Sequence, residues 1–569
     1  MDVYSTGRPR RRILLTGSTG FVGQGLLERL LSEHPDCDID LLLRRHAKST
    51  PHQRLHELLS RAVFAPWRGR VGDAHVARVV AERVTILSGG LSELDRLLVD
   101  RPPYDIVVHC AGDVSFDEAI DTSFSSNVGG VVGLYEALRA AGAHAHVVHV
   151  STAYVWADRV DIGREVAVDH DVCWRTEFAA AVAMRARREA EWHADVVRTE
   201  LSGLAPTAPA QLTRRRARWI EEQLSADGHR RARELGWTDV YTFTKALGER
   251  VAEELWAGRP LTILRPAIIE SALSHPYPGW MDGFKVADPL LAAYAKNRLP
   301  GFPGLPDAVI DVVPVDVVVN ATLAAALAPP QTPEPRYLHV GTSVTNPTTL
   351  DDIRTNVQGY FAAHPWVDSS GRTVRPSPWR FASPEALHHR LRRHAALLAA
   401  VGPLLDVTPG RLGVRVRRAS ASLSRRLTLT TQFVKLYGPY ACSTTRFDDA
   451  GTRALRAQWL HRDDGPAYLR DGFDTATIDW ARYWTQIHLP SLVDLLLITA
   501  GRADECRTAR CAPLEGDLAI VPTVAPLVPP ALAGLIEAGL TLVDEVKVAD
   551  AAKAAAQAAA TTGRRARSD

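Results

Sequence analysis

The chain has 569 residues, 46% of them hydrophobic and 23% charged, a composition typical of globular proteins. This length exceeds what one simple core accommodates, so two or three domains are expected. The 67 Lys and Arg residues nearly balance the 65 Asp and Glu residues. Nucleic-acid binding usually needs a concentrated basic face, so no nucleic-acid partner is expected.

Short apolar runs, each typical of a buried strand, alternate with helical stretches through roughly the first quarter of the chain. Helical spacing follows the first run at Leu26–Leu31 and precedes the fifth at Val131–Ala140. This alternation predicts an α/β fold with a Rossmann-type, doubly wound parallel sheet covered on both faces. The five predicted strands are Arg12–Thr16, Ile39–Leu43, Val84–Leu87, Ile106–His109 and Val147–Val150.

The later part of the chain changes character twice. Residues 171–235 are rich in Ala, Arg and Glu and poor in strand formers, which predicts a helical insertion. The α/β pattern resumes at Leu261–Pro266, Val309–Val318 and Tyr337–Val340, and beyond residue 352 the chain becomes mainly helical and Arg-rich. We therefore predict a dinucleotide-binding domain over 1–352, a helical region over 353–548 and a disordered tail over 549–569.

Three further features bear on location and metals. The six cysteines show no paired spacing of the zinc-site kind, so no metal site is expected. Met1 to Arg12 is polar and basic and lacks the apolar core of a signal peptide, which favours a cytoplasmic location.

Leu518–Ile536 is an uncharged run, but its four prolines each remove a helical hydrogen-bond donor. A buried or surface-docked segment is therefore expected there rather than a membrane span.

A glycine-rich loop, Thr16 to Gly23, follows the first predicted strand with the spacing G-x-x-G-x-x-G. Gly17 permits a tight turn, Gly20 lets the backbone approach a pyrophosphate, and Gly23 allows close helix–strand packing. The phosphates would lie at the N-terminus of the next helix, where free N–H groups and the helix dipole favour negative charge. A strand before the loop and a helix after it are the required context, so dinucleotide binding is predicted.

The end of the second predicted strand indicates which dinucleotide binds. NAD enzymes usually place Asp or Glu there for the ribose hydroxyls. Here the strand ends with Leu43, Arg44 and Arg45. A guanidinium can form a bidentate charged pair with a 2′-phosphate, so NADPH is favoured. The alternative is that both arginines are ordinary solvated surface residues.

Tyr241 and Lys245 are four residues apart, which places them on one face of a helix. In a reductase, the tyrosine donates a proton to the oxygen that becomes negative as hydride reaches the carbon. Its ordinary pKa is about 10, and we expect Lys245 and the nicotinamide charge to lower it. The fifth predicted strand ends at Ser151 and Thr152, and Thr152, or less favourably Ser151, would bond the substrate carbonyl. Each residue alone could be structural, but together they predict hydride transfer.

These residues resemble the extended short-chain dehydrogenase/reductases and, more narrowly, the fatty acyl-CoA reductases. The resemblance covers about Ile13 to Asp352, and its most specific string is P-x-P-G-W-x-D at Pro276–Asp282. The matching strings are Thr16–Gly23, His109–Gly112 with Phe116–Glu118, Asn127 with Gly129, Val150–Val155, Tyr241–Glu249, Leu264–Ser271, Pro276–Asp282, Asp311–Asn320 and Val340–Pro347.

The resemblance implies NADPH-dependent reduction of a long-chain fatty acyl-CoA to the aldehyde and on to the fatty alcohol, in lipid metabolism and wax ester biosynthesis. One departure concerns the adenine end, where the family usually has Gly-Asp and this chain has Gly89-Gly90, which removes an expected contact. By resemblance the catalytic residues are Thr152, Tyr241 and Lys245, and the cofactor-binding residues are Gly17, Thr19, Gly20, Phe21, Val22, Gly23, Arg44, Ala111, Asn127 and Pro266.

Some functional alternatives stay open. In the Arg-rich C-terminal half we expect contacts to CoA phosphates or a peripheral membrane contact, and a solvated helical face is an equal alternative. Another extended dehydrogenase acting on a sugar nucleotide or sterol is conceivable, but the P-x-P-G-W-x-D string argues against it. A non-catalytic dinucleotide sensor needs no proton donor, so the set of Thr152, Tyr241 and Lys245 argues against that function.

Overall fold

The computed structural model divides into two compact units that interleave along the chain. The first unit draws on Met1–Asp282, Asp311–Pro347 and Thr444–Tyr483, and the second on Gly283–Ile310, Thr348–Ser443 and Trp484–Asp569. The domain boundary expected near residue 352 stays a prediction. The apolar run 518–536 and the expected tail at 549–569 lie outside the described residues. Those residues are 10–46, 48–156, 160–201, 209–298, 302–383, 385–387, 389–393, 396, 431, 437–462, 465–502 and 506.

A seven-stranded parallel sheet forms the centre of the first unit, in the strand order β11-β7-β5-β4-β1-β2-β3. The strand order changes direction between β1 and β4, the switch point at which ligands bind in open α/β sheets. The predicted Rossmann-type sheet is therefore confirmed. Its strands are β1 (Arg11–Thr16), β2 (Cys37–Leu43), β3 (Val84–Ser88), β4 (Ile106–His109), β5 (His146–Val150), β7 (Leu261–Pro266) and β11 (Arg336–Val340).

Both faces of this sheet are buried, which explains the continuous apolar runs of its strands. Ile13 and Leu15 of β1 pack into one hydrophobic cluster, together with residues of α1 (Phe21–Glu33) and α12 (Val315–Ala326). Leu14 points to the opposite cluster, which contains residues of α7 (Gly130–Ala140) and α10 (Val240–Leu255). Alternate residues of one strand thus serve two cores, and the helices between strands cover both faces.

The apolar run Val309–Val318 does not form one strand. Only Val312–Pro314 is extended, as β10, and it pairs with β8 (Ile268–Glu270) outside the main sheet. Helix α12 begins at Val315, directly after Pro314, and every residue from Val315 to Ala326 is buried. Packing on all sides thus outweighs the strand preference of its valines.

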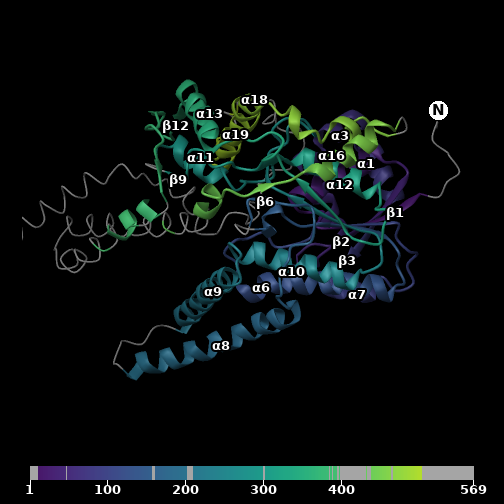
Figure 1. Ribbon diagram of the computed structural model, residues 1–569, viewed down its shortest axis with the longest axis horizontal. Coiled ribbons are helices and arrows are strands. Elements are labelled where there is room, and N and C mark those ends of the chain that lie inside the picture. The colour runs from purple at the N-terminus through teal and green to yellow at the C-terminus, as the bar shows by residue number, and fades with distance from the viewer. Residues whose placement is uncertain are drawn as a thin grey trace, which may run out of the picture. The chain divides into compact units, whose positions relative to one another are not determined.

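The predicted helical insertion is confirmed and consists of α8 (Trp174–Leu201) and α9 (Pro209–Glu234). Figure 1 shows the two long helices extending from the sheet region of the first unit. Arginines join them: Arg188 binds Asp227 through two bonds of 2.7 and 2.5 Å, and Arg231 binds Glu177 at 2.9 and 2.5 Å. The Arg- and Glu-rich composition of this stretch therefore supplies ion pairs between helices.

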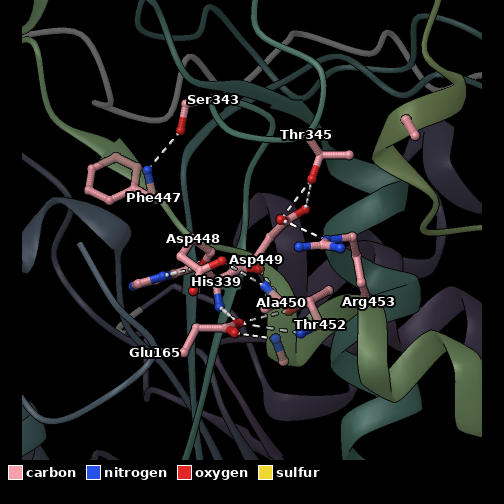
Figure 2. Close-up of polar contacts among 12 residues, drawn as sticks. Glu165, His339, Ser343, Thr345, Phe447, Asp448, Asp449, Ala450, Thr452 and Arg453 are labelled. Atoms are coloured by element: carbon pink, nitrogen blue, oxygen red, sulfur yellow. Dashed lines mark hydrogen bonds and ion pairs between the residues drawn. The ribbon is translucent and has the colours of Figure 1, made fainter. Parts of the chain in front are cut away.

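The segment Thr444–Tyr483 returns to the first unit and contributes α16 (Ala450–Leu460) beside β11. Figure 2 shows the contact: the Glu165 carboxylate accepts from the backbone N–H of His339 at 2.7 Å and of Thr452 at 3.3 Å. The Thr452 hydroxyl donates to the His339 carbonyl at 2.7 Å. Burial raises the pKa of Glu165 to about 7. A carboxylate at the first turn of α16 thus ties the returning segment to the sheet.

The other elements are short in the first unit, and in the second they are helices accompanied by two-residue strands. Among the residues that the structure describes, no helix has the length and apolarity to cross a membrane. The first unit adds α2 (Pro51–Leu59), α3 (Ala65–Val71), α4 (Asp73–Arg83), α5 (Leu94–Leu97), α6 (Ile120–Phe124), β6 (Ile162–Gly163), β15 (Arg446–Phe447), α17 (Tyr468–Asp471) and α18 (Trp480–Arg482). The second unit contains α11 (Asp288–Ala295), β9 (Phe302–Pro303), α13 (Leu350–Ala363), β12 (Trp366–Val367), β13 (Thr373–Val374), β14 (Phe381–Ala382) and α19 (Leu489–Thr499).

Candidate active site

The glycine-rich loop connects β1 to α1 at the switch point of the sheet. Gly17 has a φ of +75°, and a Cβ there would lie 2.5 Å from the Ala111 nitrogen. A Cβ on Gly23 would lie 2.1 Å from the Gly17 oxygen. The Gly20 N–H donates to the Gly17 carbonyl at 2.9 Å and closes the turn. The first and third glycines are therefore required by close backbone packing.

The loop also fits a bound phosphate. Gly20 is the N-cap of the 13-residue helix α1, and no side chain caps that end. The Ser18 hydroxyl, inside the loop, is buried and has no hydrogen-bond partner among the described residues. Helix N–H groups and a buried hydroxyl are the donors that a dinucleotide's phosphates accept. Ser18 was not among the predicted cofactor-binding residues, although it lies within the glycine motif.

The other predicted loop residues lie around this end of α1. Thr19 is partly exposed, and the Phe21 ring lies 4.8 Å from the Trp280 ring. Phe21 and Val22 both pack against the hydrophobic cluster on their face of the sheet. Gly20 is thus the exposed residue of the loop, whereas Phe21 and Val22 pack the start of α1 against the sheet.

Ala111 and Asn127 lie on the neighbouring side of the switch point. The Ala111 N–H donates to the Thr16 hydroxyl at 3.3 Å, directly beside the glycine loop. Asn127 lies in a π-helical turn (Ser125–Gly129) and is buried. Its amide accepts from the Asp113 N–H at 2.7 Å and donates to the Asp113 carbonyl at 2.9 Å. Asn127 therefore holds the backbone that follows β4.

Arg44 is exposed immediately after β2, and its carbonyl accepts from the Arg54 guanidinium. Its neighbour Arg45 pairs with Glu93 at 3.4 Å. The Glu93 carboxylate also accepts from the Gly90 N–H at 2.8 Å. A carboxylate thus lies beside Gly90, where we expected none. The signal in the sequence is its position three residues after Gly90, the spacing of a capping box.

Thr152, Tyr241 and Lys245 converge beyond the end of β5. Helix α10 begins after Asp239, whose carboxylate accepts from the Thr242 N–H at 2.9 Å. This cap places Tyr241 in the first turn and Lys245 in the second. The Thr152 hydroxyl lies beside Tyr241 and donates to the Pro266 carbonyl at 3.4 Å. Pro266 therefore supports the catalytic side of the site.

The buried Lys245 ammonium lies beside the end of β5. Its Nζ donates to the Val150 carbonyl at 2.6 Å. Burial lowers the pKa of Lys245 to about 8, and the carboxylate of Glu249, one turn later on α10, acts in the opposite direction. Glu249 is itself bound by the fully buried Arg265 through bonds of 2.9 and 2.7 Å. This ion pair fixes α10 against β7.

We expected Lys245 to lower the pKa of Tyr241, but the surrounding protein groups together raise it. Burial raises the pKa of Tyr241, the hydrogen bond from Thr152 opposes the shift, and the carboxylates of Asp239 and Asp113 add to it. Removing a phenolate from water costs more than one hydrogen bond returns. Tyr241 is therefore held in its protonated form.

Known proteins resemble this chain over most of its length. It is 29% identical over 504 residues to the "Probable fatty acyl-CoA reductase 4" of Arabidopsis thaliana, covering 86% of this chain and 97% of that protein. It is 28% identical over 503 residues to the "Alcohol-forming fatty acyl-CoA reductase" of Simmondsia chinensis, with the same coverage. The terminal R domain of the myxalamid biosynthetic pathway shares the fold, with a TM-score of 0.50, 16% identity and coverage of 87% and 92%.

The NAD-binding family model described as "Male sterility protein" matches residues 15–322, which is more than half of the chain. The matched range begins in β1 and includes the glycine loop, Thr152, Tyr241 and Lys245. A nicotinamide dinucleotide is accordingly the cofactor that this fold binds. The chain belongs to the male sterility protein family.

Proposed function

We propose that this protein reduces a long-chain fatty acyl-CoA with NADPH, first to the aldehyde and then to the primary alcohol, with release of CoA. One observation carries the proposal: the hydroxyls of Thr152 and Tyr241 lie near a buried ammonium, Lys245, at the end of β5, on the ligand-binding edge of the parallel sheet. The names of the two plant relatives support the fatty acyl-CoA substrate.

The residues suit acyl reduction. When bound, reduced nicotinamide supplies a hydride to the thioester carbon, whose oxygen then carries the negative charge. Thr152 and Tyr241 would donate hydrogen bonds to that oxygen, and Tyr241 would transfer its proton to it. The resulting hemithioacetal loses its C–S bond, its hydroxyl proton passes to the thiolate, and CoA thiol and aldehyde result. Once Tyr241 has regained a proton from solvent, it would protonate the oxygen again when a second equivalent of NADPH reduces the aldehyde.

The preference for NADPH rests on the exposed guanidinium of Arg44 at the end of β2. A 2′-phosphate on the adenosine ribose would form a charge-assisted pair with it. Lys245, beside the end of β5, would hold the nicotinamide ribose and keep a positive charge near Tyr241. The Arg-rich C-terminal region would contribute contacts to CoA phosphates or a peripheral membrane contact.

Incubation of the purified protein with NADPH and palmitoyl-CoA tests the proposal. We expect NADPH absorbance to fall and chromatography to show hexadecanol with little free hexadecanal. Replacing NADPH by NADH should slow the reaction. No nucleotide oxidation with any medium- or long-chain acyl-CoA would contradict the proposal, and accumulation of aldehyde alone would remove its second step.

A further inference from the structure

The segment Pro276–Asp282, the most specific string in the sequence, has no part in the chemistry above. In the structure its end packs on the start of α1. The Trp280 ring lies 4.8 Å from the Phe21 ring. Trp280 also lies beside Gly25 of α1, where a Cβ would be at ordinary contact distance from the ring, 3.6 Å. This segment therefore lies directly against the nucleotide-binding helix.

Asp282, the last residue of the string, joins three separate parts of the chain. One carboxylate oxygen accepts from Gln24 Nε2 at 2.6 Å and from Arg61 Nη1 at 3.2 Å. Both donors also reach the carbonyl of Thr19, Gln24 at 3.0 Å and Arg61 at 3.1 Å. Gln24 is buried, and about a third of the Arg61 side chain is exposed. Two side chains held by one carboxylate thus converge on one backbone oxygen of the glycine loop.

These bonds fix the peptide group between Thr19 and Gly20 at both ends. Its oxygen is held by the two side-chain donors, and its N–H donates to the Gly17 carbonyl at 2.9 Å. A peptide group is planar, so holding both ends sets its orientation. That orientation determines where the N–H groups at the start of α1 point. A loop ordered before binding avoids the entropy cost of being ordered on binding.

We infer that Asp282 is a positioning residue for the nucleotide: it holds Gln24 and Arg61 on the Thr19 carbonyl and so preorganises the glycine loop. The inference rests on the nucleotide-binding part of the proposed function and not on the acyl substrate. Without the carboxylate, Arg61 keeps only a neutral carbonyl acceptor and gains access to solvent. Bonds to charged groups are the stronger ones, so the carboxylate supplies the main restraint.

Binding of NADPH and NADH to the full chain, followed by nucleotide fluorescence, tests the inference. We expect Asp282→Ala to raise both dissociation constants about tenfold, because both nucleotides share the pyrophosphate. Arg61→Ala should have a smaller effect in the same direction. The double variant should bind no more weakly than Asp282→Ala, since both residues act on one carbonyl. Asp73→Asn, in the exposed Arg68–Asp73 pair of 2.8 Å, is the matched control and should bind as the unaltered protein does.

Hydrogen exchange provides a readout that does not depend on the ligand. Asp282→Ala should speed exchange in residues 17–23 and leave the strands of the sheet unchanged. If Asp282→Ala does not fold, Asp282→Asn, which keeps the shape of the side chain, serves instead. It should raise both dissociation constants about threefold and speed exchange in residues 17–23. A lower melting temperature with unchanged affinity and unchanged exchange would show a merely structural role and overturn the inference.

A second outcome would also overturn it. If Arg61→Ala weakens binding while Asp282→Ala strengthens it, then Arg61 contacts a phosphate directly and Asp282 competes for it. Failure of the unaltered protein to bind either nucleotide would instead contradict the proposed function. The exchange of residues 17–23 would still decide whether Asp282 orders the loop.

Discussion

The glycine loop and the group Thr152, Tyr241 and Lys245 lie at the same edge of one sheet, yet they are assembled differently. The loop is one contiguous segment, Thr16–Gly23, in which backbone atoms approach each other without intervening side chains. The catalytic group comes from two elements, the end of β5 and helix α10. The helical insertion lies between these two elements in the chain. We therefore expect Gly17 and Gly23 to accept no side chain, whereas the catalytic group should accept changes that keep its shape but not loss of a hydroxyl or charge.

The two regions also differ in electrostatics. Near its turn the loop offers N–H groups, a helix dipole and a hydroxyl, none of which titrates near neutrality. The catalytic group contains buried ionisable side chains, and burial moves the pKa values of Lys245 and Tyr241 in opposite directions. Nucleotide binding through the loop should thus be insensitive to pH in a range where catalysis is sensitive.

The largest expected effect separates catalysis from binding. Tyr241→Phe removes the proton donor but keeps the ring, which packs edge-on at 5.7 Å against Phe116. We expect kcat to fall by about 100- to 1000-fold, the loss typical of one oxyanion donor, with the NADPH dissociation constant nearly unchanged. Single-turnover rates and nucleotide titration measure the two quantities. Loss of nucleotide binding would show that the two regions are not separable.

Gly23→Ala should act on the loop alone. The new Cβ would lie 2.1 Å from the Gly17 carbonyl oxygen, so the backbone must move. We expect nucleotide affinity to fall about 100-fold, because overpacking at this backbone distance displaces the turn. Gly69→Ala is the control, since a Cβ there meets nothing within 4 Å. Normal affinity in the Gly23 variant would contradict the backbone account of the loop.

Arg44→Ala tests the adenosine side of the nucleotide site. Removing one charged partner of a 2′-phosphate should weaken NADPH about tenfold and leave NADH nearly unchanged. Arg45→Ala is the matched control, because Arg45 pairs with Glu93 at 3.4 Å. Calorimetric titration with both nucleotides measures the difference. Equal weakening of NADPH and NADH would refute the 2′-phosphate assignment.

The smallest expected effect is the pH dependence of the catalytic group. Burial lowers the pKa of Lys245 to about 8, so its charge is present below that pH and is lost as the pH rises through it. We expect kcat/KM to be about halved near pH 8 and to fall further above it, while nucleotide affinity through the loop stays level. Lys245→Arg keeps a charge at all these pH values and should remove this decline. A decline that persists in the variant would assign it to another group.

Local sequence specifies the elements that carry the site. Apolar runs of buried strands, the glycine spacing and the Asp239 cap that starts α10 are short-range features, so the sheet, the loop and the helix bearing Tyr241 and Lys245 follow from them. Chain-local patterns did not indicate that Val309–Val318 divides between a short strand and a buried helix. The choice there depends on what packs around α12, which is information held by distant residues.

The sequence by itself determined the nucleotide-binding sheet, its glycine loop and the residue types for hydride transfer, because each depends on neighbours within a few positions. The tertiary structure alone decided the pKa directions of Tyr241 and Lys245, since burial arises from groups far along the chain. It also decided that Glu93 lies beside Gly90 and that Asp282 reaches Gln24 and Arg61. Long-range contacts of this kind leave no periodic signal in a single sequence, because folding and not spacing brings their partners together.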